Sequence, residues 1–322
     1  QPKCDDQVLL ASHTVCARDK RQMAITFRTI EEETNKLNQK YLVQPVDNRF
    51  VVVNPSFPPM TTEGLDAVYD LPFTRLPHPK YKGKTIPAFD MIRFSVNTHR
   101  GCFGGCAFCS ISMHQGKFVV SRSAESVLKE VQKIAEMPDF KGYLSDLGGS
   151  SANMYQMRGR DLELCAKCKR PSCIFPQVCK NMNTDHRPLL DLYRRVDALP
   201  CVKKSFIGSG IRYDLLLHRT GNETVDKANR EYTRELITKH VSGRLKVAPE
   251  HTSDAVLAVM RKPNFSLFRE FKRIFDKINA DEHLNQQLIP YFISSHPGCE
   301  LQDMAELAVE TKNLNFQLEQ VQ

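Results

Sequence analysis

Three cysteines in one short loop are the strongest constraint on the fold of this chain. They form the run Cys102-x₃-Cys106-x₂-Cys109 and follow directly on a β-rich stretch, residues 91–97. Three closely spaced thiolates are the ligand set expected for a 4Fe-4S cluster whose fourth iron has no protein ligand and can bind a small molecule. The chain must therefore fold so that one tight loop after a strand gathers these sulfurs around a single site.

The residues between the cysteines suit a loop that closes around a cluster. Gly104 and Gly105 allow the backbone to turn tightly. Phe103 and Phe108 supply an apolar environment, which helps to set the potential of a cluster. The sequence of the loop therefore predicts an iron–sulfur site rather than an ordinary surface turn.

A zinc knuckle is the alternative for these cysteines. Structural zinc requires four ligands, and the nearby candidates for a fourth ligand are His99 and His114.

The 11 cysteines of the chain are odd in number, clustered and not preceded by a secretory signal. Metal ligation therefore fits the chain better than a secreted disulfide scaffold does.

Length and charge limit the possible classes of protein. With 322 residues the chain can bury a full core, in one large domain or two smaller ones. No apolar run approaches the roughly 18 residues of a membrane span, and we expect a cytoplasmic protein. The first residue is not Met, which suggests a fragment of a longer protein. The net charge of +8 favours a polyanionic partner such as RNA, although scattered solvated lysines would give the same charge.

Strand-like and helix-like segments alternate after the first strand, which is the pattern of parallel βα units. The predicted strands are residues 91–96, 143–147, 205–207, 244–248, 288–293 and 316–321. The predicted helices are residues 123–137, 189–199, 231–240, 254–260, 265–278 and 302–314. About six units are too few for a closed eight-stranded barrel. The expected fold class is therefore α/β, with a partial (β/α)6 barrel over residues 91–322.

Residues 1–90 have a different pattern. A helical run over residues 22–42 precedes a strand-like segment, residues 49–53, and prolines are frequent in residues 54–60 and 76–79. Prolines at this density favour an extended crossing over a surface. We expect residues 1–90 to be the tail of an upstream domain and a linker, which form a small N-terminal α/β extension packed on the barrel.

The cysteine motif, with Phe108 just before its last cysteine, resembles the signature of the radical S-adenosylmethionine (SAM) superfamily. The resemblance implies that the open iron binds the amino and carboxylate groups of SAM. It also implies that an electron from the cluster cleaves SAM to a deoxyadenosyl radical, and that an open six-stranded barrel carries the cluster in the loop after its first strand. Phe108 then belongs to the cofactor-binding residues.

Ligands of parallel αβ sheets bind beyond the carboxyl ends of the strands, so the loops at these ends should line one mouth. Gly148 and Gly149 resemble the superfamily's glycine motif, which receives the amino group of SAM, although Ser150 stands where an acidic residue is common. After the third strand, Ser209 and Arg212 would bind a carboxylate.

The next two strand ends complete the expected SAM site. Glu250, after the fourth strand, would accept hydrogen bonds from ribose hydroxyls. The turn after the fifth strand, with His296 and Gly298, would contact adenine. Residues 248–263 also resemble radical SAM methylthiotransferases, and residues 91–322, above all 294–299, resemble the YgiQ family of radical SAM proteins without an established reaction. This resemblance covers about three quarters of the chain and implies the cofactors rather than the substrate.

A second group of cysteines lies in a Cys-rich insertion, residues 160–187, within the barrel. Its spacing is C-x₂-C-x₄-C-x₅-C, formed by Cys165, Cys168, Cys173 and Cys179. Four thiolates in a segment with little apolar material indicate metal binding as the organising force. Structural zinc is the first expectation, an auxiliary iron–sulfur cluster is the alternative, and disulfides or free thiols are the remaining one. Basic residues around the ligands could contact phosphates, which leaves a small nucleic-acid module open as well. His186 could replace one cysteine as a ligand, although a single histidine before a helix is more often a cap or a core residue.

These observations together predict a radical SAM enzyme that reductively cleaves SAM at a 4Fe-4S cluster. Its substrate is unknown; the resemblance to methylthiotransferases and the basic charge favour modification of RNA or of a protein side chain. The expected partners are that substrate and an electron donor such as flavodoxin or ferredoxin, and no membrane. The alternative is a metal-stabilised protein without catalysis, in which both cysteine groups hold zinc and the basic residues bind nucleic acid.

Overall fold

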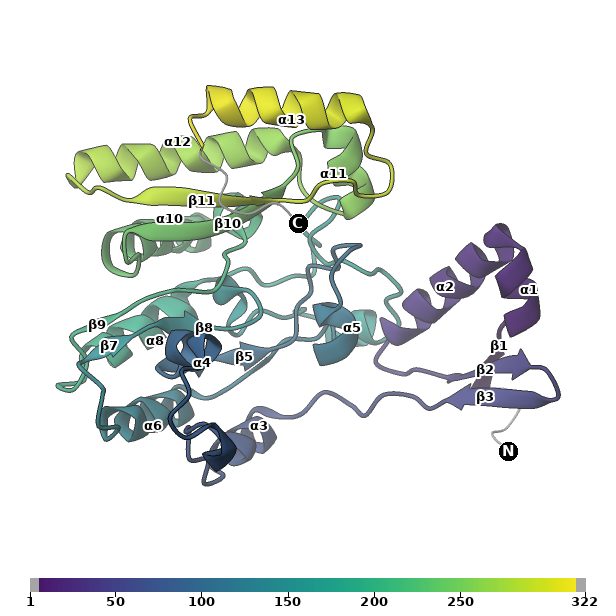
Figure 1. Ribbon diagram of the computed structural model, residues 1–322, viewed down its shortest axis with the longest axis horizontal. Helices are drawn as coiled ribbons and strands as arrows, with labels where there is room; N and C mark the ends of the chain where they lie inside the picture. The colour runs from purple at the N-terminus through teal and green to yellow at the C-terminus, as the bar shows by residue number, and fades with distance from the viewer. Residues whose placement is uncertain (1–5, 317–322) are drawn as a thin grey trace.

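The computed structural model describes residues 6–316 of the chain, which begins with a small α/β unit (Figure 1). Its sheet has the order β1-β2-β3, with β1 parallel and β3 antiparallel to β2. The elements of this unit are β1 (Gln7–Leu9), α1 (His13–Arg18), α2 (Lys20–Thr34), β2 (Tyr41–Val46) and β3 (Arg49–Val53). In Figure 1 the unit lies at one end of the molecule, with α2 reaching toward α5 (Ile111–Gln115).

The helix predicted for residues 22–42 is wrong in its C-terminal part. Helix α2 ends at Thr34, and the chain re-enters as β2. Asn35 ends the helix, because its side-chain amide donates to the carbonyl oxygen of Glu31 at 2.7 Å and caps the last turn. Leu42 and Val43 are buried in β2, so the apolar residues taken for a helical face pack as a strand instead.

Five parallel segments, one of which is divided into two short strands, follow one another as neighbours in chain order. Parallel pairing joins β4 to β8, β7 to β9 and β10 to β11, and a parallel bridge between Ile211 and Val247 joins the segment after β9 to β10. The strands are β4 (Ser95–Asn97), β7 (Tyr143–Leu144), β8 (Asp146–Gly148), β9 (Lys204–Ser205), β10 (Arg244–Glu250) and β11 (Gln287–Phe292). The predicted α/β class is confirmed. The six-stranded partial barrel stays a prediction, because residues 317–321 of the expected sixth strand lie outside the described residues.

The first strand is shorter than residues 91–96 and begins later. Helix α4 (Pro87–Ile92) occupies the start of that range, and β4 begins at Ser95. Pro87 stands in the first turn of α4, where its fixed φ favours a helix and its missing N–H costs nothing. A short antiparallel pair, β5 (His99–Arg100) and β6 (Val120–Ser121), then encloses the cysteine loop and α5.

The helices that follow the strands agree with the predicted segments to within a few residues, except that α10 begins eight residues before residue 231. They are α6 (Ala124–Ala135), α8 (Arg187–Asp197), α10 (Glu223–Lys239), α11 (Asp254–Met260), α12 (Phe265–Asp281) and α13 (Leu301–Asn313). The early start of α10 follows from a cap: the side chain of Asn222 accepts from the N–H groups of Thr224 and Val225. Helix α6 buries one face completely, and Val127, Val131 and Ile134 are inaccessible to solvent.

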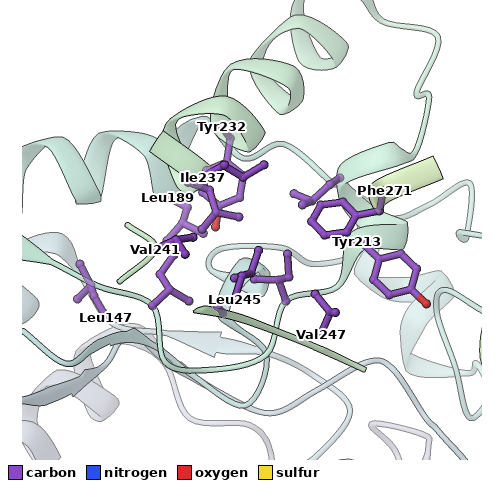
Figure 2. Packing of buried hydrophobic residues seen from close by; sticks show 14 of the residues in the cluster. Leu147, Leu189, Tyr213, Tyr232, Ile237, Val241, Leu245, Val247 and Phe271 are labelled. Atoms are coloured by element: carbon purple, nitrogen blue, oxygen red, sulfur yellow. The ribbon is translucent and has the colours of Figure 1, made fainter. Parts of the chain in front are cut away.

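The core lies between the parallel strands and the helices that cover them (Figure 2). Leu147 of β8 and Leu245 and Val247 of β10 are fully buried in it. On its far side the rings of Tyr213 and Phe271 stack with their centroids 5.7 Å apart. This core fixes where the strands end, and therefore where the loops beyond them meet.

Residues 54–90 connect the N-terminal unit to the parallel strands and are held to them by polar contacts. Arg75 donates from Nη2 to the carbonyl oxygen of Ser95 at 2.6 Å, at the start of β4. Asp66, in α3 (Thr62–Tyr69), accepts from the N–H of Ser123 at 3.1 Å. Within the described residues, none of the helices has the length and apolar composition needed to cross a membrane.

Candidate functional site

The predicted cluster cysteines lie in the loop between β5 and α5. The loop starts where the N–H of Cys102 donates to the carbonyl oxygen of Gly116 at 3.0 Å, and it turns again where the N–H of Cys109 donates to the carbonyl oxygen of Cys106 at 3.1 Å. Phe103 is buried, with 2% of its surface exposed. The first motif therefore lies where the sequence predicts it, beyond the first of the parallel strands.

The loop has room for a cluster only because Gly104 lacks a side chain. A Cβ atom at Gly104 would lie 3.2 Å from the Cys102 sulfur and 3.8 Å from the Cys106 sulfur. The N–H of Gly104 also donates to the Cys102 sulfur at 3.4 Å, which is the contact a thiolate ligand needs. Three thiols, a backbone donor and a side-chain-free space between the sulfurs fit a 4Fe-4S cluster.

Arg212 approaches this loop from the end of the third parallel strand. Its Nη1 lies 3.4 Å from the sulfur of Cys106, and its side chain is only 11% exposed. Burial raises the pKa of the Cys102 thiol, and the positive charge of Arg212 is the largest influence that lowers it. The guanidinium therefore favours the thiolate form that binds iron.

Arg212 was predicted to bind a carboxylate, and the carboxylate it binds here is that of Asp214. Its Nε donates to Asp214 Oδ1 at 3.0 Å and its Nη2 to Oδ2 at 2.6 Å. Asn153 holds the backbone of Arg212, accepting from its N–H at 2.7 Å and donating to its carbonyl oxygen at 2.9 Å. The sequence analysis did not identify Asp214 or Asn153 as site residues. Asp214 could have been found, because an acidic residue two positions after Arg212 is a candidate partner for its guanidinium.

The glycine turn and the third strand end meet, as predicted. A Cβ atom at Gly148 would lie 2.8 Å from the hydroxyl of Ser209, so the two backbones approach closely. The N–H groups of Gly208 and Ser209 donate to Asp146 Oδ1 at 2.9 and 3.1 Å, and the Ser209 hydroxyl donates to Oδ2. Burial raises the pKa of Asp146, while these three donors lower it. Asp146 therefore fixes the Ser209 loop over the glycine turn.

Gly149 lies against a buried histidine of β5. A Cβ atom at Gly149 would lie 2.6 Å from the imidazole of His99, which excludes any other residue there. Burial lowers the pKa of His99 to about 4, so the ring is neutral. The next residue, Ser150, donates to Gln115 Oε1 at 2.8 Å, and the same oxygen accepts from the N–H of Gly101 at 3.2 Å. The glycine turn is thus connected to the start of the cysteine loop.

Glu250 ends β10 with a left-handed backbone, φ = 72°. This conformation is uncommon for a residue other than glycine and is typical of functional sites. Its carboxylate lies 3.6 Å from the Nζ of Lys262, whose side chain is 5% exposed. Burial raises the pKa of Glu250, and the charge of Lys262 lowers it. Burial also raises the pKa of Cys109, and the negative charge of Glu250 adds to this rise.

The fifth strand end also reaches the cysteine loop. The rings of Phe108 and His296 are perpendicular, with their centroids 6.2 Å apart. Gly298, with φ = 84°, continues the same turn, and a Cβ atom there would lie 3.6 Å from Val259 of α11. The turn with His296 and Gly298, which was predicted to contact adenine, therefore lies on the same side of the cysteine loop as Phe108.

Helix α11 and the N-terminal unit hold the loop from outside. The N–H of Ala107 donates to the carbonyl oxygen of Met260 at 3.0 Å. Arg261 donates to the carbonyl oxygen of Gly105 at 3.3 Å and forms a two-point ion pair with Glu31 of α2, at 2.6 and 2.8 Å. Residues of the N-terminal unit, which the sequence placed apart from the site, are thus linked to its central loop.

The Cys-rich insertion packs directly on the first cysteine loop. The N–H of Cys173 donates to the carbonyl oxygen of Phe103 at 3.0 Å. Gly105 has φ = 58°, and a Cβ atom there would lie 2.1 Å from the carbonyl oxygen of Pro171. His186 is buried, and its two ring nitrogens contact Asn153 and Asn229. This histidine therefore supports the fold rather than supplying a ligand to the cysteines.

The sequence of the chain is similar to that of known proteins. Residues 1–95 match the family model described as Radical SAM N-terminal. A UPF0313 protein of Bacteroides thetaiotaomicron is 67% identical over 321 residues, which are 100% of this chain and 52% of the relative. A UPF0313 protein of Porphyromonas gingivalis is 61% identical over 319 residues, 99% of this chain and 50% of the relative. This chain belongs to the UPF0313 family of radical SAM proteins.

The UPF0313 relatives are longer proteins: the chain spans about half the length of the curated relatives it matches. Among solved structures, the cobalamin-dependent SAM radical enzyme OxsB, with aqua-cobalamin bound, is 12% identical with a TM-score of 0.48. The match covers 89% of this chain and 34% of OxsB. At this similarity it supports no inference about the ligands of the UPF0313 chain.

Proposed function

We propose that this chain is a radical SAM enzyme that reductively cleaves SAM at a 4Fe-4S cluster held by Cys102, Cys106 and Cys109. One observation carries the proposal: loops from four different strand ends meet at the cysteine loop, and one of them places Arg212 3.4 Å from the sulfur of Cys106. A single structural zinc site would not need such an open mouth of strand-end loops, whereas a cofactor site does.

The residues of the chain have separable roles in this proposal. The three thiols bind iron as thiolates, so cluster binding releases their protons. Arg212 offsets the negative charge that these thiolates bring into a buried place. Asp214 neutralises Arg212 when no cluster is bound, because a lone buried guanidinium would be costly. Gly104 keeps the space between the sulfurs clear.

SAM would bind on the side of the loop where the predicted contacts meet. The backbone of Gly148 and Gly149 offers carbonyl oxygens to its amino group, and the Ser209 loop closes over this turn. The Glu250 carboxylate accepts from ribose hydroxyls, and Lys262 keeps that carboxylate charged. His296 and Gly298 line the adenine side, with Phe108 across from them.

When bound, a reduced 4Fe-4S cluster supplies the electron that splits SAM to methionine and a deoxyadenosyl radical, which then takes a hydrogen atom from a substrate. The chain itself orients SAM and excludes water from the radical. We propose RNA or a protein side chain as the substrate class, supported by the net charge of +8. The electron would come from a small redox protein such as flavodoxin or ferredoxin.

The experiment is anaerobic reconstitution with iron and sulfide, followed by reductant and SAM and by mass-spectrometric detection of deoxyadenosine. The wild type should form deoxyadenosine, and Cys106→Ala should form none because one iron loses its thiolate. Cys201→Ala is the matched control, since Cys201 is a half-buried cysteine outside both groups and its loss should leave the rate unchanged. SAM cleavage by Cys106→Ala at the wild-type rate would contradict the ligand assignment.

The rival function is a zinc-stabilised nucleic-acid-binding protein. It predicts a colourless, iron-free protein after the same reconstitution, with zinc in both cysteine groups. Visible absorption and quantification of iron, sulfide and zinc on one sample distinguish the two functions. The close approach of Arg212 to a cysteine sulfur favours the enzyme, because zinc-finger cysteines need no buried cation beside them.

A further inference from the structure

The four cysteines of the insertion share one cavity of about 940 Å³. The cavity lies between the insertion and the strand segment that returns from the first cysteine loop, and Phe103 forms part of its wall. Its lining includes all four thiols, Cys165, Cys168, Cys173 and Cys179. Residues up to 14 positions apart in the sequence therefore face a common space.

Local backbone contacts bring these cysteines together in pairs. The N–H of Cys168 donates to the carbonyl oxygen of Cys165 at 3.1 Å, and the N–H of Cys179 donates to that of Cys173 at 2.7 Å. Asn181 donates from its side chain to the Cys165 sulfur at 3.3 Å, as a residue next to a metal-bound thiolate does. Apart from α7 (Leu162–Ala166), residues 160–186 contain no helix, and their only strand-type pairing is one isolated bridge, so little regular secondary structure holds the four cysteines in place.

The spacing of the thiols distinguishes one metal ion from a cluster. A zinc ion with bonds of about 2.3 Å holds its sulfurs near 4 Å from one another. A polynuclear cluster places each thiolate on a different iron and so keeps the sulfurs farther apart. Four thiols that line one cavity of about 940 Å³ leave room for the second arrangement.

The surroundings of the cavity are apolar with one buried cation. Phe103, Met157 and Met182 form a buried hydrophobic cluster, against which Cys102, Cys173 and Cys179 pack. Lys117 is 5% exposed and donates to the carbonyl oxygen of Arg170 at 2.8 Å. A cluster with four thiolates is anionic, and a buried lysine at its edge offsets that charge.

We propose that Cys165, Cys168, Cys173 and Cys179 bind a second iron–sulfur cluster. Phe103 of the first cysteine loop forms part of the wall of this site, and the N–H of Cys173 donates to its carbonyl oxygen, so the two cysteine segments are in direct contact. The site does not depend on the proposed SAM chemistry, because its ligands and cavity are complete without the first three cysteines.

The test uses a variant in which the first site is removed by Cys102→Ala, Cys106→Ala and Cys109→Ala together. After anaerobic reconstitution this triple variant should keep about four iron and four sulfide atoms per chain, the content of one 4Fe-4S cluster. Mössbauer spectra of ⁵⁷Fe-labelled protein should show a cluster signal from the second site alone. Adding Cys173→Ser should remove the remaining iron, whereas adding Cys201→Ser should not.

Two results would overturn the proposal. One is a triple variant that binds one zinc per chain and no iron; the other is a triple variant, folded by circular dichroism, that binds neither metal. If Cys173→Ser fails to fold, Cys168→Ser in the same background gives the same test. The result is independent of deoxyadenosine formation, so failure of this site and failure of the proposed function are separate outcomes.

Discussion

Arg212 lies with its Nη1 3.4 Å from the sulfur of Cys106, although 106 residues separate them in the chain. The guanidinium is held in this position by Asp214, so a buried cation and a buried anion accompany the first cysteine loop. The two side chains act on the cluster with opposite sign. The two charges should therefore influence the reduction potential of a cluster bound to these cysteines.

We expect the double variant Arg212→Gln, Asp214→Asn to lower the reduction potential of the cluster. A positive charge next to a ligand sulfur stabilises the reduced, more negative state. The double variant removes both charges, and the guanidinium, which itself contacts the Cys106 sulfur, sets the sign of the shift. Asp214→Asn alone removes only the anion and should raise the potential. A redox titration monitored by electron paramagnetic resonance measures both, and a shift of the same sign in both variants would disprove the contact.

Gly105→Ala should destabilise the protein by more than its backbone conformation alone explains. A left-handed φ costs an L-residue about 1–2 kcal/mol, and at Gly105 the new Cβ would also lie 2.1 Å from the backbone oxygen of Pro171. Gly83→Ala is the matched control, since Gly83 has φ = 78° and nothing within 4 Å of its Cβ position. Urea unfolding measures both variants, and equal losses would contradict the packing of the insertion on the loop.

Acid should unfold the protein partly through His186. Burial lowers its pKa from an ordinary value of 6.5 to about 4, so the unfolded state binds a proton that the folded state refuses. The contribution of His186 to the unfolding free energy is therefore fully present above pH 6.5 and is lost as the pH falls toward 4. The loss amounts to about 2 kcal/mol at pH 5. His186→Gln should reduce the difference in unfolding free energy between pH 7.5 and pH 5 by this amount. An unchanged difference would show that His186 does not contribute.

Glu31→Gln should loosen the N-terminal unit from the rest of the chain. The pair of Glu31 with Arg261 is two-point and mostly shielded, with 18% and 25% of the side chains exposed, and we expect a loss of about 1 kcal/mol. Limited proteolysis should then cut residues 54–61 faster. Arg28→Gln is the control on the same helix, because Arg28 is 80% exposed and pairs with Glu32 of the same helix at 2.8 Å. Equal proteolysis of the two variants would rule out the anchoring role.

The sequence predicts the parallel strand order and the positions of most helices because both depend on local periodicity. Helix α11 occupies residues 254–260 as predicted, and the loops after β9, β10 and β11 meet at the cysteines. Local signals fail at the boundaries of elements. Pro87 begins a helix whose last two residues take the start of the expected strand, and residues 41–42 of the expected helix lie in β2.

The partners of the site residues could not be read from the sequence, because they depend on how distant segments pack. The pairing of Glu250 with Lys262 needs the left-handed turn at the end of β10. The contact of Gly105 with Pro171 needs the insertion to fold back on the first loop. Neither contact follows from a periodic pattern in the sequence, because each joins residues that lie close together only after the chain has folded.

The order of the strands has a consequence for biosynthesis. Cys102, Cys106 and Cys109 leave the ribosome well before Arg212, Glu250 and His296, which later surround them. During translation the loop is therefore open on every side that these residues will cover. Iron and sulfide delivered in that interval would reach the three cysteines with the least obstruction. Each strand end that folds afterwards would cover one more side of the loop and make loss of a bound cluster harder.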